Sequence, residues 1–254
     1  MTPVMIKRRR SQVESKSAPL NFSILDSQSH TWREAPSLPA KLASLSVSVL
    51  DGKIYVAGGH VSEFLKNTLE VFDTETQTWD LKTIPCTVTK SNVYHPRSAC
   101  IDGKFHVKTS TEAVVYNCKE SGWDLFEREM GKYMIAESYC VIENVLYSAL
   151  HGELIWYDSD VCKWRCLKGL EGLPDIPFGA CVRLADYGGK LAVLWEGDVF
   201  DLRHGGSYRN IWCAEIALDR RKKGRGIWGE VEWCDDVLTI PKLCKLVKVL
   251  SVTL

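Results

Sequence analysis

Four tryptophans divide most of this chain into segments of similar length. Trp32, Trp79, Trp123 and Trp164 are 47, 44 and 41 residues apart. Each one ends a similar stretch, in which an apolar residue and an Asp or Asn are followed by a short run, mostly polar, that leads to the tryptophan. Self-similarity at a period of about 20 to 50 residues is typical of architectures in which each copy must pack on its neighbours. The period therefore limits the fold to a repeat architecture.

A second landmark, two alternating apolar runs joined by a tight turn, recurs with the same period. The clearest copy has runs at 45–50 and 54–59 and the turn Asp51-Gly52-Lys53 between them. Asp-Gly readily supplies the positive φ angles that a two-residue hairpin turn requires. A second hairpin follows at 69–81. The turn recurs as Asp102-Gly103-Lys104, Gly188-Gly189-Lys190 and, in degenerate form, Glu143-Asn144-Val145. Each repeat is therefore predicted to form four antiparallel strands.

A four-stranded sheet of this size has two faces to bury, so neighbouring copies should pack face to face and build a propeller. Each tryptophan is then expected on an outer strand with its ring buried between sheets. Trp228 and Trp233 mark the outer hairpin of the last full repeat, and Gly58 and Gly59 end a strand where the backbone is crowded. The alternative is an open β-sandwich with a chance tryptophan spacing. Two independent landmarks with one period favour the propeller.

These residues resemble a known repeat. Residues 50–59, followed by 69–73 and Trp79, resemble the kelch repeat, and residues 21–254 resemble the propeller portion of plant F-box/kelch-repeat proteins. Later copies depart from the pattern, with Thr109-Ser110 and His151-Gly152 where the double glycine belongs. The resemblance implies an all-β, kelch-type propeller of four-stranded antiparallel blades, with four complete blades and one composite or incomplete blade.

The two ends of the sequence determine the expected domain limits. We expect a disordered basic, Ser-rich tail over 1–20 and a propeller over 21–254, with repeats at 42–84, 97–127, 137–168 and 180–234 and partial repeats at 21–36 and 246–254. The partial repeats could combine into a three-stranded blade that closes a small ring. Alternatively, the chain is a truncated member of a family with larger rings. No segment of the chain resembles the F-box of the family.

Composition excludes several classes of partner. Lys plus Arg and Asp plus Glu number 32 each, so there is no global field to attract nucleic acid or a membrane surface. The basic hairpin tip at 219–226 and the run Lys7–Arg10 are expected to be solvated. The alternative for both is a nucleic-acid or nuclear-import patch, and Lys7–Arg10 is the candidate nuclear-import signal. No apolar run is long enough to span a bilayer. We expect a soluble protein of the cytoplasm or nucleus, without membrane or nucleic-acid partners.

The chain lacks the motifs that carry most enzyme chemistry. Its six histidines have no metal-ligand spacing, and its ten cysteines include no pair of Cys-x2-Cys motifs. A chain of this length with no signal peptide is expected to keep its cysteines reduced. No nucleophile elbow, phosphate loop or dinucleotide fingerprint is present. We therefore predict no catalytic residues, no metal, no cofactor and no enzymatic activity.

The strand order predicts where partners would bind. With tight turns after the first and third strands of each blade, the longer loops gather on the opposite rim, and loops on a rigid scaffold are where function concentrates. Aromatic residues and arginines on such a rim commonly anchor interfaces. Each candidate could equally be an ordinary loop residue or could plug the core. The candidates are His60, Glu63, Phe64, Lys66, Tyr94, His95, Arg97, Tyr133, Met134, Glu137, His151, Phe178, His204, Tyr208 and Arg209.

The resemblance implies a role in recognition. F-box/kelch-repeat proteins present targets to a cullin–RING (SCF-type) ubiquitin ligase, so a protein target is the expected partner. Without an F-box, this chain is not expected to bind a Skp-type adaptor. A scaffold propeller without a role in degradation, and a carbohydrate-binding or enzymatic propeller, remain as alternatives.

Overall fold

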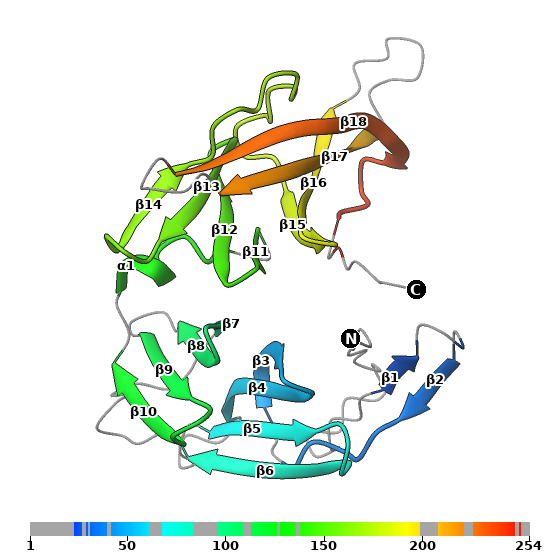
Figure 1. Ribbon diagram of the computed structural model, residues 1–254. Coiled ribbons are helices and arrows are strands. Elements are labelled where there is room, and N and C mark those ends of the chain that lie inside the picture. The colour runs from blue at the N-terminus through cyan, green and yellow to red at the C-terminus, as the bar shows by residue number, and fades with distance from the viewer. Residues whose placement is uncertain are drawn as a thin grey trace. The chain divides into compact units, whose positions relative to one another are not determined.

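The computed structural model describes residues 23–26, 29, 31–39, 42–60, 68–83, 96–108, 113–125, 128–135, 138–198, 208–220, 226–246 and 249. The chain divides into two compact units, residues 1–131 with 252–254, and residues 132–251. Figure 1 labels the strands of both. No helix in the described part of the chain is long and apolar enough to cross a membrane.

The first unit contains a two-stranded sheet and two four-stranded sheets. The two-stranded sheet pairs β1 (Ser23–Asp26) with β2 (Thr31–Glu34). The first blade consists of β3 (Leu42–Leu50), β4 (Lys53–His60), β5 (Thr68–Asp73) and β6 (Thr78–Thr83). The second consists of β7 (Arg97–Ile101), β8 (Lys104–Lys108), β9 (Ala113–Asn117) and β10 (Gly122–Leu125), and the short helix α1 (Arg128–Gly131) follows it.

The second unit contains two more four-stranded sheets. The third blade consists of β11 (Tyr139–Ile142), β12 (Val145–Leu150), β13 (Glu153–Asp158) and β14 (Lys163–Cys166). The fourth consists of β15 (Val182–Tyr187), β16 (Lys190–Asp198), β17 (Tyr208–Arg220) and β18 (Ile227–Pro241). Within each sheet, every strand pairs antiparallel with its neighbour in sequence. The prediction of an all-β fold with four complete four-stranded propeller blades is confirmed. The partial repeat at 246–254 lies almost entirely outside the described residues.

The first turn of each blade has the predicted conformation. Both central residues have positive φ, which is the geometry of a type I′ turn and matches the twist of the strands it joins. Their φ angles are 48° and 72° at Asp51-Gly52, 51° and 71° at Asp102-Gly103, 47° and 63° at Glu143-Asn144, and 62° and 87° at Gly188-Gly189.

The turn before three of the repeated tryptophans has a shared hydrogen-bond pattern. The Oδ1 atom of an Asp or Asn accepts from backbone amides two or three residues later, in an Asx-turn. The acceptors are Asp73, Asn117 and Asp158. The fourth residue after each of them has positive φ: 57° at Gln77, 53° at Ser121 and 55° at Cys162. The Asp or Asn of the sequence repeat is therefore a turn-forming residue.

Apolar side chains from the first two blades form one core between them. Tyr55 and Leu69 of the first blade cluster with Phe105 and Val114 of the second. The rings of Tyr55 and Phe105 stack with centroids 5.3 Å apart. At the inner strands, the hydroxyls of Ser46 and Ser48 lie 2.8 and 3.0 Å from that of Ser98. The two sheets thus pack face to face, as the repeat predicted.

The repeated tryptophans lie on outer strands but are not fully buried. Trp79 on β6 is half-buried, contacts Phe72 at a centroid distance of 5.0 Å, and donates Nε1–H to the carbonyl of Pro36 at 2.9 Å. Trp123 and Trp164 are likewise half-buried. The expectation that each tryptophan buries its ring between sheets is wrong for Trp32, which is exposed.

The core of the second unit is centred on the fourth blade. Its cluster includes Leu191 and Trp195 from β16 and Ile216 from β17, packed with Tyr147 and Trp156 of the third blade. The ring of Trp195 stacks on that of Trp212 at 6.0 Å. At the far end of β17, Arg220 donates to the carbonyls of Ile142 and Glu143 in the first turn of the third blade. The two blades are held by both apolar packing and polar contacts.

Candidate partner-binding surface

Several of the predicted rim residues lie outside the described part of the chain. His60 is the last residue of β4, and its side chain is not among those described. The others outside it are Glu63, Phe64, Lys66, Tyr94, His95, Glu137 and His204. These residues stay predictions.

Four of the described rim candidates have contacts within the chain. The ring of Tyr133 packs edge-to-face on Trp164 with centroids 5.5 Å apart, and Met134 is only 2% exposed. Half-buried Arg97 donates to the carbonyl of Pro96 at 3.0 Å. The Nη1 atom of Arg209 lies 2.9 Å from Oε2 of Glu196. Burial and these contacts give the four side chains structural roles within the chain.

The remaining candidates, His151, Phe178 and Tyr208, are exposed, and the first two lie together. His151 and Gly152 form a two-residue turn between β12 and β13, with φ angles of 54° and 88°. The segment 167–181, which joins the third and fourth blades, passes over this turn. A Cβ atom at Gly152 would lie 2.5 Å from the carbonyl oxygen of Ile176. The rings of His151 and Phe178 have centroids 5.0 Å apart. We call these two residues the His151–Phe178 patch.

The position of this patch differs in one respect from the sequence prediction. The kelch resemblance placed His151-Gly152 where a double glycine would end a strand before a longer loop. The structure instead has a tight turn, because β12 ends at Leu150 and β13 begins at Glu153. Phe178 is 80% exposed although it is aromatic, so water covers most of a ring that a partner could bury. An exposed aromatic ring beside a tight turn suits a protein interface better than a small-molecule site.

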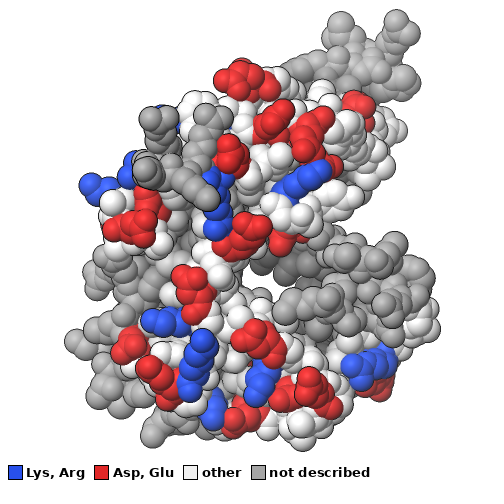
Figure 2. All heavy atoms as spheres, viewed as in Figure 1, with Lys and Arg blue, Asp and Glu red and all other residues white. Residues whose placement is uncertain are grey.

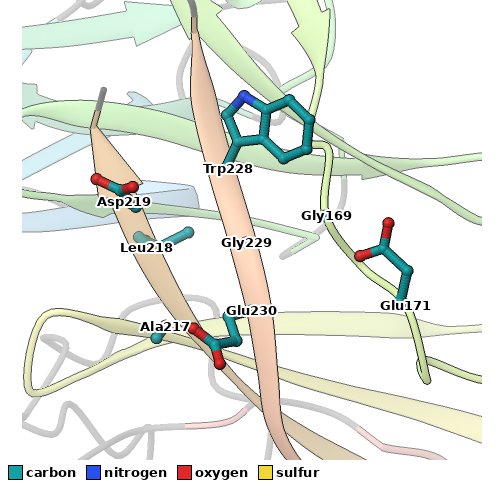
Figure 3. Close-up of a pocket in the computed structure, with 8 residues that line it drawn as sticks. All are labelled: Gly169, Glu171, Ala217, Leu218, Asp219, Trp228, Gly229 and Glu230. Atoms are coloured by element: carbon teal, nitrogen blue, oxygen red, sulfur yellow. The ribbon is translucent and has the colours of Figure 1, made fainter. Parts of the chain in front are cut away.

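A pocket of about 370 Å³ lies at the outer side of the fourth blade, where segment 167–171 meets the β17–β18 hairpin (Figure 3). The amide of Gly229 donates to the carbonyl of Lys168 at 2.6 Å. Gly169 permits this approach, because a Cβ atom there would lie 2.5 Å from the carbonyl oxygen of Gly229. Sequence reasoning did not find this pocket. It is lined by Gly169, Glu171, Ala217, Leu218, Asp219, Trp228, Gly229 and Glu230.

The acidic groups of the pocket do not form a metal site. In Figure 3 the carboxylates of Glu171, Asp219 and Glu230 point in different directions and not toward a common centre. Among the described residues, no group of three or more His, Cys, Asp or Glu side chains could hold a metal ion. What the pocket offers is an indole face beside carboxylates.

Buried His106 lies in the second blade and does not line this pocket. Burial lowers its pKa to about 4, so this imidazole is neutral near pH 7.

Acidic side chains also gather on the surface of the fourth blade. Figure 2 shows several of them over the region of β17 and β18. The ammonium of Lys190 lies 2.6 Å from Oε2 of Glu232 and also pairs with Glu215. These two contacts raise the pKa of the lysine. The sequence gives no global charge excess, so the acidic surface over β17 and β18 is a local feature.

Comparison with known proteins adds to this picture. A family model described as the FKB95 kelch-repeats domain matches residues 8–238. F-box/kelch-repeat protein At5g51250 of Arabidopsis thaliana is 52% identical over 240 residues, which are 92% of this chain and 64% of that protein. F-box/kelch-repeat protein At3g06570 of the same plant is 46% identical over 240 residues, 92% of this chain and 61% of that protein.

A third relative is covered more fully. F-box/kelch-repeat protein At5g38670 of Arabidopsis thaliana is 45% identical over 237 residues, 91% of this chain and 79% of that protein. The chain spans 64% and 61% of the first two relatives. The predicted resemblance to plant F-box/kelch-repeat proteins is confirmed. With its family model matched over most of its length, this chain belongs to the FKB95 kelch-repeat family.

Proposed function

We propose that this chain recognises a protein target as the substrate-binding part of an SCF-type ubiquitin ligase. The observation that carries the proposal is the exposed His151–Phe178 patch on a propeller whose relatives are F-box/kelch-repeat proteins. Binding proteins commonly place aromatic anchors on short, well-packed turns, because little conformational entropy is lost when the partner docks. The imidazole of His151 supplies a polar group beside the apolar ring of Phe178.

The proposal is tested by a matched pair of aromatic substitutions. Phe178→Ala removes the exposed ring of the patch, and Tyr187→Ala removes another exposed ring, at the end of β15 next to the tight turn Gly188-Gly189. Wild type and both variants are tagged in plant cells, and co-purified proteins are identified by mass spectrometry. We expect one or more proteins to be recovered with wild type and Tyr187→Ala and lost with Phe178→Ala. Identical partner sets for all three proteins would refute a binding role for the patch.

The link to degradation requires a separate measurement. For each protein lost with Phe178→Ala, its half-life is measured after depletion of this chain, with and without a proteasome inhibitor. We expect depletion of this chain to lengthen the half-life, and the inhibitor to lengthen it no further. An unchanged half-life would instead assign the propeller a non-degradative scaffold role. Because the chain spans about three fifths of the first relatives, the ligase role of the whole protein is part of the proposal.

A further inference from the structure

Strand β18 exposes apolar side chains at the edge of the fourth blade. It is the last strand in the order β15-β16-β17-β18, so one side of it has no partner strand among the described residues except at Trp228, which bridges to Lys168. Further along, Trp233 is 45% and Leu238 57% exposed, and Val237 is also exposed. We call Trp233, Asp235, Asp236, Val237 and Leu238 the outer strip. Large apolar groups gathered on a surface commonly mark an interaction site.

The outer strip is acidic as well as apolar. Strand β18 carries four acidic residues and no Lys or Arg between Ile227 and Pro241. Glu232 is paired with Lys190, but the hydrogen bonds of Asp235 and Asp236 are to neutral groups. Asp235 accepts from the amide of Asp236 at 2.8 Å, and Asp236 accepts from the side-chain amide of Asn210 at 2.6 Å. Neither carboxylate forms an ion pair with another described residue, so both can pair with a cationic partner.

The register of β18 indicates how a partner would contact it. Trp233, Asp235 and Leu238 lie opposite Glu215, Cys213 and Ile211, alternate residues of β17, so they share one face of the sheet. The register shifts twice, and the extra residues on β18 are Glu232 and Val237. Such bulges interrupt the regular row of backbone groups at an edge and discourage the addition of another strand. Recognition at this strip would therefore use side chains and not a long backbone ladder.

We propose that the outer strip is a second protein-binding surface, which takes a partner segment with Lys or Arg residues beside apolar anchors. The indole of Trp233 would bury the apolar anchor, and Asp235 on the same face would pair with a basic residue. Asp236 lies opposite Trp212 and therefore on the other face, so it would attract basic residues around the edge of the strand. A second copy of this chain fits less well, because a two-fold contact would bring the same carboxylates against each other. This surface goes beyond the His151–Phe178 patch and does not depend on it.

The test uses three labelled synthetic peptides and the full chain. One peptide alternates Leu and Lys, the second replaces Lys by Glu, and the third replaces Leu by Ser. Fluorescence anisotropy should show that wild type binds the first peptide more tightly than either control. We expect Trp233→Ala to weaken binding by about tenfold or more. Asp235→Asn with Asp236→Asn should weaken binding and reduce its salt dependence, since screening acts on the charge that has been removed.

Matched variants show whether a loss of affinity comes from the strip itself or from unfolding of the protein. Leu238→Ser is a second change in the strip, and Tyr187→Ala and Asp175→Asn alter an exposed aromatic and an exposed acidic residue elsewhere in the same unit. Circular dichroism checks the fold of each. The two apolar strip variants, Trp233→Ala and Leu238→Ser, should lose affinity while the two controls and Phe178→Ala keep it. Equal binding of the Glu peptide, or unchanged affinity in both strip variants, would overturn the proposal. A dimer in sedimentation experiments that Trp233→Ala dissociates would assign the strip to a second copy instead.

Discussion

At the scale of single residues, Gly152 shows how closely segment 167–181 approaches the third blade. Its φ of 88° is accessible to glycine without strain, and the carbonyl of Ile176 occupies the space where a side chain would begin. Gly172 has a similar φ of 91°, but nothing lies within 4 Å of the place where its Cβ atom would be. The two glycines therefore separate the cost of backbone conformation from the cost of a clash.

We predict that Gly152→Ala destabilises the protein more than Gly172→Ala. Both substitutions place a Cβ atom on a left-handed residue, at about 1–2 kcal/mol. Gly152→Ala must also displace the backbone at Ile176, which adds about 1–3 kcal/mol of overpacking. Urea denaturation followed by tryptophan fluorescence measures both free energies of unfolding. Equal losses of unfolding free energy in the two variants would show that segment 167–181 is not in tight contact with the His151-Gly152 turn.

Residue-scale prediction succeeded where a turn has a characteristic pair of residues. Asp51-Gly52 identified a type I′ turn, but His151-Gly152 was taken as the end of a strand before a longer loop, although it has the same conformation. Histidine adopts positive φ less commonly than Asn or Gly, so its presence did not indicate this turn. The contact between His151 and Phe178 joins a turn of the third blade to the segment that follows that blade, and no local pattern could predict it.

At the scale of strands, the repeated tryptophans do not contribute equally. Trp79 packs with Ile54 and Phe72 and is hydrogen-bonded to Pro36, whereas Trp32 is exposed on β2. The same position of the repeat therefore serves as a core residue in one copy and as a surface residue in another.

We predict that Trp79→Ala lowers the free energy of unfolding by about 2–4 kcal/mol, because it empties a half-buried site. Trp32→Ala should change it by about 0.5 kcal/mol or less, as is usual for an exposed side chain. Thermal and urea unfolding of the two variants measure the difference. A loss at Trp32 as large as that at Trp79 would contradict the assignment of Trp32 as a surface residue.

Strand boundaries were predicted least well in the fourth blade. The last repeat was expected to end at 234, but β18 continues to Pro241. The pair Asp235-Asp236 has low strand propensity, yet pairing of this region with β17 outweighs that local preference. The outer strip was missed for the same reason, since four of its five residues lie beyond the expected boundary at 234.

At the scale of the whole molecule, the cysteines contribute as free thiols. The nine cysteines in the described part of the chain form no disulfides with one another. Burial raises the pKa of Cys100 and Cys140, so these thiols stay protonated and unreactive in the folded protein. They act as small apolar side chains between strands.

We predict that a reducing agent leaves the melting temperature of the protein unchanged. No cross-link among the described residues constrains the unfolded chain, so reduction should remove no stability. Differential scanning fluorimetry with and without dithiothreitol measures this. Alkylation in denaturant without reductant, followed by intact-mass analysis, should modify at least the nine described cysteines. A melting temperature that falls on reduction would reveal a disulfide and contradict the prediction.

The pairing of every strand with its sequence neighbour also affects how the chain folds. Each sheet closes only short loops, and closing a short loop costs less chain entropy than joining distant segments. For an all-β protein this arrangement keeps the hydrogen-bonded contacts local, and local contacts favour fast folding. During synthesis, the hydrogen bonds of one blade can be completed before the residues of the next blade have left the ribosome. The apolar faces of that blade then remain open until the next one arrives, so we expect the nascent chain to be most prone to aggregation between one blade and the next.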